Sequence, residues 1–160
     1  MVWPLDSRKY WIKWKTRTPN NSRLGIEGYS KTPLVKKLGI KSGQNILLLS
    51  VPEHYFELFS GFPEGVTQLD SEAIEQADFI HLFAQNYGIL KSQAQNAKRA
   101  LKKTGILWVS WPKGTSSIVT DLNRELVREH LLQLGLVDTK VAAIDKDWSG
   151  LKFMYRLKDR

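Results

Sequence analysis

The chain has 160 residues, a formal net charge of +8 and no cysteine. Its length predicts one domain with a sizeable hydrophobic core. The lack of cysteine excludes disulfides, thiolate metal sites and cysteine nucleophiles. No apolar run approaches the roughly 20 residues that a membrane-spanning helix needs, and the first residues are polar and aromatic rather than rich in Leu and Ala. We therefore expect a cytoplasmic protein without a transmembrane segment.

The positive charge is concentrated near the beginning of the chain. Residues 1–23 hold six basic residues against Asp6 alone, a balance of +5, whereas the rest of the chain holds 18 basic and 15 acidic residues, a balance of +3. Aromatic side chains are interspersed among the early bases, which is typical of a segment that binds nucleic acid or an anionic surface. The alternative is a poorly ordered extension. The candidate nucleic-acid-binding residues are Lys9, Lys13, Lys15 and Arg17.

We assign residues 1–27 to a basic, Trp-rich N-terminal extension and residues 28–160 to a single Rossmann-like α/β domain. Within the domain, Thr32 is a predicted helix N-cap, Pro33 the first helical residue and Gly39 the helix end. Later elements are predicted as a strand over 45–51, a short helix from Pro52, a strand over 66–69, a brief helical link over 71–77 and a strand over 78–84.

The second half of the chain alternates helical and strand patterns. A helix is predicted from Asn86 or Tyr87 to Lys103, with Gly105 as its end. The run I-L-W-V-S after this glycine is apolar on both faces, which is typical of a buried strand in a parallel sheet. The remaining elements are predicted as a helix capped by Thr120 or Asp121 and ending at Leu134, then strands over 137–144 and 151–157.

These elements predict an α/β fold with a doubly wound, mostly parallel, six-stranded Rossmann-like sheet in three α/β/α layers. The last two strands form a C-terminal antiparallel hairpin. With right-handed crossovers, only the strand over 151–157 runs antiparallel to the others. The expected order across the sheet is 66–69, 45–51, 78–84, 106–111, 151–157, 137–144.

Several segments resemble a small bacterial family known as domain of unknown function 3052. The resemblance covers about five sixths of the chain and begins near residue 28. It implies no established activity. The matching segments are G-Y-S-K-T-P-L-V-K-K-L-G-I-K (28–41), L-L-L-S-V-P-E (47–53), D-F-I-H-L-F (78–83), L-W-V-S-W-P-K (107–113), T-D-L (120–122), L-G-L-V-D-T-K-V (134–141) and W-S-G-L-K (148–152).

A second resemblance is architectural. The segment L-K-K-T-G-I-L-W-V-S and the closing hairpin are similar to parts of class I methyltransferases. That resemblance implies an S-adenosylmethionine site, with Asp70 standing where an acidic residue would meet the ribose. Here, however, the expected glycine-rich turn reads Ser50-Val51-Pro52-Glu53. Pro52 has no amide to donate, and Glu53 would repel the carboxylate of the cofactor. We therefore expect no cofactor and at best millimolar binding of S-adenosylmethionine.

The candidate ligand site comes from topology, because open α/β sheets bind ligands beyond the carboxyl ends of their strands. His81, in the middle of a strand, is interpreted as a hydrogen-bonded core histidine rather than a base. The three histidines have no spacing that would converge on a metal ion. The alternative for the two tryptophans is that they close the rim of the sheet. The candidate ligand-binding residues are Ser50, Glu53, Asn86, Trp111, Lys113 and Trp148.

Three functions are compatible with this sequence. The leading hypothesis is a non-catalytic Rossmann-like module that binds a partner protein or a small ligand. The rival is a methyltransferase-like enzyme with an altered cofactor loop, and the third is a nucleic-acid-associated protein that uses the basic extension. The missing glycine loop separates the first two, and salt-dependent binding distinguishes the third.

Overall fold

The computed structural model of the protein describes residues 32–160. The basic extension predicted over residues 1–27 lies outside the described residues, as do its candidate nucleic-acid-binding side chains. Within residues 32–160, no helix has the length and hydropathy that a membrane span requires.

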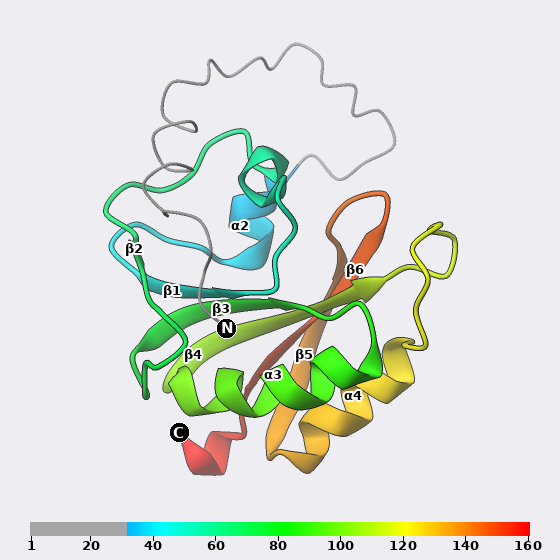
Figure 1. The fold of residues 1–160 in the computed structure, drawn as a ribbon. Helices are drawn as coiled ribbons and strands as arrows, with labels where there is room; N and C mark the ends of the chain where they lie inside the picture. Colours follow the sequence, from blue (N-terminus) through cyan, green and yellow to red (C-terminus); the bar gives the residue numbers. More distant parts are fainter. Residues whose placement is uncertain (1–31) are drawn as a thin grey trace.

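Six strands organise the described residues into one sheet (Figure 1). They are β1 (Asn45–Leu49), β2 (Thr67–Gln68), β3 (Ala77–Phe83), β4 (Leu101–Pro112), β5 (Leu136–Ala143) and β6 (Trp148–Tyr155). Their order is β2-β1-β3-β4-β6-β5. The first four strands pair in parallel, and β6 is antiparallel to both of its neighbours. The predicted order and the predicted direction of the hairpin are both confirmed.

Helices cover both faces of the sheet (Figure 1). They are α2 (Leu34–Leu38), α3 (Tyr87–Ala100) and α4 (Arg124–Gln133), with short 3-10 helices η1 (Tyr55–Leu58) and η2 (Leu157–Asp159). α3 and α4 pack on one face, and α2 and η1 lie on the other. Side chains along β3 point alternately to the two faces of the sheet. Ile80 and Leu82 pack in the core under α3 and α4, whereas Phe79 and Phe83 pack in the core under α2 and η1. The predicted three-layer fold is thus confirmed.

The junction between α3 and β4 differs from the prediction. The helix ends at Ala100, and the strand begins at once with Leu101, which pairs with Ala77. The last carbonyls of α3 accept hydrogen bonds from residues that precede β3, so the helix ends without a glycine. Gly105 lies inside β4, where an added Cβ would come within 2.8 Å of the Ala77 carbonyl oxygen. This glycine therefore permits close packing of the backbone and does not end a helix.

Two predicted helix caps are wrong. The N-cap of α2 is Pro33 rather than Thr32. Pro33 has an extended ψ of 143°, and its carbonyl accepts hydrogen bonds from the Lys36 and Lys37 amides. In α4 the N-cap is Asn123, whose side chain accepts a hydrogen bond from the Leu126 amide. The expected cap Thr120 accepts instead from the Leu122 amide, and Asp121 from the amide of Tyr87 in α3.

The segment over 71–77 forms no helix. Asp70 accepts a hydrogen bond from the Glu72 amide in a turn, and Glu75 has a φ of +48°, which a helix cannot accommodate. The helix predicted from Pro52 is a single 3-10 turn, η1. The preceding strand ends at Leu49, two residues before the predicted end, because Ser50 also has a positive φ.

Candidate functional site

The carboxyl ends of β1, β3 and β4 lie at one edge of the sheet, together with the turn between β5 and β6. The turn reaches this edge because Pro112 at the end of β4 pairs with Trp148, and the Lys113 amide donates to the Asp147 carbonyl at 2.8 Å. We call this the carboxyl edge. β1 lies between β2 and β3, so the strand order reverses there, and such a point is where open α/β sheets bind ligands.

The first turn at the carboxyl edge follows β1. Ser50 has a φ of +54°, in the left-handed region that favours glycine. The Pro52 carbonyl accepts a hydrogen bond from the Tyr55 amide at 3.0 Å and so begins η1. Between them, Glu53 and His54 are exposed. The chain therefore reverses here as it would at a glycine, but it presents a hydroxyl, a carboxylate and an imidazole.

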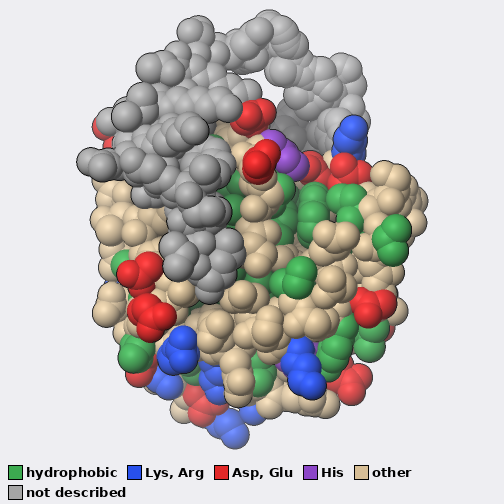
Figure 2. All heavy atoms as spheres, viewed as in Figure 1, with side chains coloured by type: hydrophobic (Ala, Val, Ile, Leu, Met, Phe, Trp, Pro, Cys, Tyr) green, Lys and Arg blue, Asp and Glu red, His purple; other side chains and the backbone are tan. Residues whose placement is uncertain are grey.

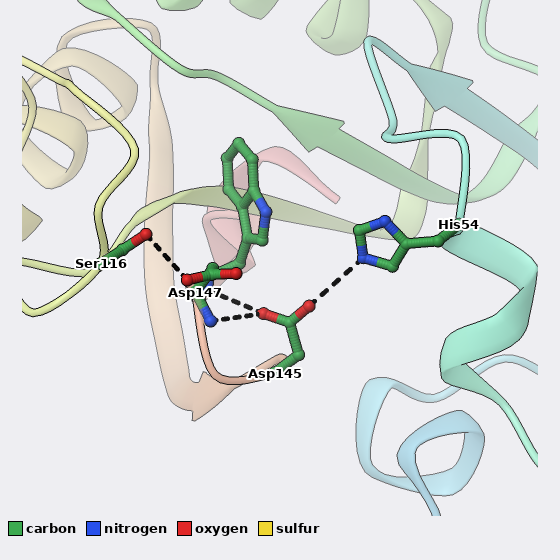
Figure 3. Close-up of polar contacts among 5 residues, drawn as sticks. His54, Ser116, Asp145 and Asp147 are labelled. Carbon is green, nitrogen blue, oxygen red and sulfur yellow. Dashed lines mark hydrogen bonds and ion pairs between the residues drawn. The ribbon is translucent and has the colours of Figure 1, made fainter.

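The turn between β5 and β6 presents a second carboxylate, that of Asp145 (Figure 3). One of its oxygens, Oδ1, accepts hydrogen bonds from the Asp147 amide at 2.8 Å and the Trp148 amide at 2.9 Å. The other, Oδ2, lies 3.4 Å from Nε2 of His54. Both oxygens are thus occupied, which holds the carboxylate in one orientation.

The next carboxylate in this turn is tied to the loop after β4. Ser116 donates from Oγ to Oδ1 of Asp147 at 2.9 Å (Figure 3), and its own Oγ accepts from the Ile118 amide. With the hydrogen bond from the Lys113 amide to the Asp147 carbonyl, these bonds attach the hairpin turn to the loop after β4 at two points. The position of Asp145 therefore depends on the sheet and not on a free loop tip.

The predicted site residues divide between three environments. Asn86 caps α3 by accepting a hydrogen bond from the Ile89 amide, so its side-chain oxygen is engaged. Trp111 is buried in the core under α3 and α4. Trp148 is buried on the opposite face, where its ring packs against that of Phe83 with 4.9 Å between the ring centroids. Both tryptophans pack within the layers on opposite faces of the sheet, and they do not converge on one point.

The other three predicted residues remain near solvent. Ser50 and Glu53 are exposed in the first turn, and Lys113 is half-buried at the start of the loop after β4. His54 lies next to Glu53 and, through Asp145, reaches the same hairpin turn as Lys113. The carboxyl edge thus brings the first turn and the β5–β6 turn together.

A second polar group lies directly beneath this edge, in the core. The Tyr55 hydroxyl contacts Nδ1 of His81 at 3.0 Å, and Nε2 of His81 contacts Oγ of Ser110 at 2.7 Å. We call these residues the buried chain. All are fully or almost fully buried, and burial lowers the pKa of His81 to about 3 and raises the pKa of Tyr55. Because burial disfavours the charged form, the imidazole is neutral, and a neutral ring can satisfy both hydroxyls with one donor and one acceptor.

Charge is distributed unequally between the two edges of the sheet. Figure 2 shows acidic side chains and a histidine at the top of the described surface, and Lys and Arg side chains mainly lower down, where further acidic side chains lie among them. The turns of the carboxyl edge hold Glu53, Asp121, Asp145 and Asp147 against Lys113 and Lys146. The opposite edge holds Lys41, Lys98, Arg99, Lys102, Lys103, Arg156, Lys158 and Arg160 against Glu64, Glu72, Glu75, Asp78 and Asp159.

Sequence reasoning missed Asp145, Asp147 and Ser116. The D-K-D-W pattern indicates a turn, and this signal was correctly interpreted, but it does not identify a partner for the carboxylates. Asp145 and His54 are 91 positions apart in the chain. Among residues 32–160, no group of three or more His, Asp, Glu or Cys side chains could hold a metal ion.

Comparison with solved structures places this architecture among the α/β methyltransferase Rossmann-like folds. A SAM-dependent methyltransferase from Aquifex aeolicus aligns with a TM-score of 0.55 and 17% identity, over 91% of this chain and 98% of that one. A TehB-like SAM-dependent methyltransferase from Corynebacterium glutamicum aligns with a TM-score of 0.54 and 12% identity, over 94% and 98%. Precorrin-6y C5,15-methyltransferase from Geobacter metallireducens aligns at 0.53 and 9% identity, over 77% and 86%.

The identities are low, so these likenesses define the fold alone. No family model and no curated protein matches this sequence.

Proposed function

We propose that the protein is a methyltransferase-like enzyme with an altered cofactor loop, which binds S-adenosylmethionine at the carboxyl edge. The fold supports this proposal, since solved methyltransferases align over nearly all of the chain. The observation that carries it is the composition of the edge itself: an acid-rich surface at the strand-order reversal, with an exposed histidine held against a fixed carboxylate.

The charges of the carboxyl edge fit the cofactor better than the first turn alone suggests. S-adenosylmethionine carries a positive sulfonium, a positive ammonium and one carboxylate, so it is a net cation near neutral pH. The carboxylate of Glu53 in the first turn is suited to its ammonium group. The positive φ of Ser50 gives the turn a glycine-like path at the point where the backbone would approach the ligand. When bound, the cofactor would supply an electrophilic methyl group.

The second candidate is the non-catalytic binding module, which the composition of the first turn favours. Pro52 removes one amide donor, and Glu53 carries the same sign of charge as the cofactor carboxylate that it would meet there. A like-charge contact of this kind costs on the order of 1–4 kcal/mol. Since each 1.4 kcal/mol is about a tenfold loss, the upper end of this range would turn micromolar affinity into millimolar affinity.

Calorimetric titration with S-adenosylmethionine decides between the two functions. A dissociation constant below about 50 μM, a favourable free energy of about 6 kcal/mol, supports the enzyme. A millimolar value contradicts it and leaves the binding module. A thermal-shift screen against nucleotides and other small metabolites would then search for the ligand, because a saturating ligand raises stability by a few kcal/mol.

Substitution of Glu53 tests the sign of the interaction. If Glu53 pairs with the ammonium group, Glu53→Gln should weaken binding about fivefold, since an exposed pair contributes about 1 kcal/mol. If the carboxylate repulsion dominates, the same change should tighten binding. Glu64→Gln is the matched control, because Glu64 is also exposed but lies away from the carboxyl edge, beside Gly43 before β1.

A further inference from the structure

We propose that His54 is the general base of the carboxyl edge and that Asp145 is its positioning residue. This inference rests on the proposed function and adds the class of acceptor: a hydroxyl or N–H group that must lose a proton. The observation behind it is a side-chain arrangement and not a sequence motif. The His54 side chain is 47% exposed and the Asp145 side chain 21% exposed, so the imidazole is accessible while its partner is largely enclosed.

The Asp145 carboxylate is fixed before any ligand arrives. Two backbone amides, of Asp147 and Trp148, hold Oδ1, and this leaves Oδ2 directed at His54 (Figure 3). Two further hydrogen bonds attach this turn to the loop after β4, one from the Lys113 amide to the Asp147 carbonyl and one from the Ser116 hydroxyl to the Asp147 carboxylate. A base is effective when a second group, itself held by further hydrogen bonds, orients its ring.

The contact with Asp145 determines which ring nitrogen acts. An ionised carboxylate only accepts hydrogen bonds, so in the neutral imidazole Nε2 carries the hydrogen and donates it to Asp145. The lone pair is then at Nδ1, on the side of the ring away from Asp145 (Figure 3). The separation of 3.4 Å is long for a hydrogen bond, as is common at catalytic pairs without bound substrate.

The assigned step is a single proton transfer. The X–H bond of the acceptor, where X is oxygen or nitrogen, breaks and leaves its electron pair on X. The proton forms a new N–H bond at Nδ1 of His54, and the resulting positive charge lies beside the Asp145 carboxylate. An acceptor that already has a free lone pair, such as a thioether or a tertiary amine, would not need this step. The arrangement therefore points to a protic acceptor.

The alternative is a surface ion pair that only joins two turns. Nitrogen NMR of the full chain tests the hydrogen bond that the assignment requires, because it reports the tautomer of each of the three histidines. The rate measurement below then distinguishes a base from a structural pair. We expect neutral His54 to be in the Nε2–H tautomer, and Asp145→Asn, which places a side-chain N–H where Oδ2 was, to raise the population of the Nδ1–H tautomer. The variant keeps a side-chain oxygen for the two amides but cannot accept from His54 in the same way. An unchanged tautomer in the variant would overturn the proposal.

A chemical and a kinetic readout complete the test. Diethyl pyrocarbonate, which modifies accessible neutral imidazoles, should react faster at His54 than at half-buried His130, and severalfold more slowly at His54 in Asp145→Asn.

With S-adenosylmethionine and a set of protic acceptors, His54→Gln should lower kcat by about 100-fold or more without changing the calorimetric Kd of the cofactor. His130→Gln is the matched control and should keep both. Equal losses in kcat and in cofactor affinity would overturn the assignment. A failed cofactor titration overturns the proposed function alone, since the tautomer and labelling results need no cofactor.

Discussion

Two histidines are neighbours of Tyr55, His54 in the chain and His81 through a hydrogen bond, and their surroundings differ. His81 is fully buried between two hydroxyls, and burial lowers its pKa to about 3, so it stays neutral in the folded protein. His54 begins the turn that leads into η1, is about half exposed and faces a carboxylate. Only one residue, Tyr55, belongs both to the buried chain and to the segment next to His54. Residue type alone therefore does not decide whether a histidine is enclosed in the core or accessible to a ligand.

The comparison also separates stability from chemistry. In the buried chain every polar atom that loses a partner stays in the core, where it cannot find water. At the carboxyl edge, water replaces a lost partner. Substitutions in the buried chain should therefore change the free energy of unfolding strongly. Substitution of the exposed His54 at the carboxyl edge should change chemistry with little effect on folding.

The largest effect is expected for His81→Leu. This change leaves the hydroxyls of Tyr55 and Ser110 without their shared partner, and each buried unsatisfied group costs about 1–3 kcal/mol. We expect the free energy of unfolding to fall by about 3 kcal/mol and the melting temperature by about 10 °C. Urea unfolding measures the first and calorimetry the second. Tyr55→Phe, which removes one hydroxyl and keeps the ring, should lose about half as much, and a loss below 1 kcal/mol for His81→Leu would show that the chain is not a stabilising network.

The second effect is a loss of stability in acid. The unfolded chain binds a proton at His81 near pH 6.5, whereas the folded protein does so only near pH 3. Stability is therefore fully present above pH 6.5 and falls as the pH drops towards 3, by about 2 kcal/mol at pH 5. Urea unfolding at pH 7 and pH 5 measures the difference, which should largely disappear in His81→Leu.

Two other groups must be separated from this effect. Partial burial and then the charge of Lys91 lower the pKa of His130, so it contributes with the same sign, and the measurement is best made in His130→Gln. At Asp78, burial acts to raise the pKa, but hydrogen bonds from Lys102 and the Asn45 amide outweigh it and hold the pKa below its usual value. Its contribution is lost only below about pH 4 to 5. If the free energy of unfolding still differs between pH 7 and pH 5 in the double variant His81→Leu/His130→Gln, another group is responsible for the acid sensitivity.

The sequence predicts the buried half of this comparison better than the exposed half. The order of the strands follows from apolar runs and right-handed crossovers, and a histidine within such a run is predicted to be a core residue, as His81 is. The predicted end of α3 is wrong, because Gly105 was interpreted from local helix signals as the helix end. The pairing of Leu101 with Ala77 instead decides where the helix ends. The contact between His54 and Asp145 depends on the pairing of β6 with β4, which brings the β5–β6 turn to the carboxyl edge. No local sequence pattern predicts that two residues so far apart in the chain come into contact.

The third prediction tests whether the buried chain needs any part of the N-terminal extension. Deletion of residues 1–23 removes a net charge of +5 but none of the described contacts. The melting temperature should fall by less than about 5 °C, roughly 1 kcal/mol or less. A larger fall would mean that the extension belongs to the core and that the domain boundary near residue 28 is wrong. If the extension binds nucleic acid, the same deletion should remove salt-dependent binding to it.

The smallest effect on stability is expected for His54→Gln. The contact it removes is an exposed ion pair, and such pairs contribute about 0–1 kcal/mol because water screens the charges and the side chains lose entropy when they are fixed. Asp145 keeps its two amide partners in this variant, so the β5–β6 turn retains its structure. We expect urea unfolding to give a change within about 0.5 kcal/mol. Asp145→Ala, which removes both amide contacts, is the contrasting variant and should cost about 1–2 kcal/mol. If His54→Gln destabilises the protein as much as Asp145→Ala does, the pair holds the two turns together, and the imidazole is a structural group of the same kind as His81.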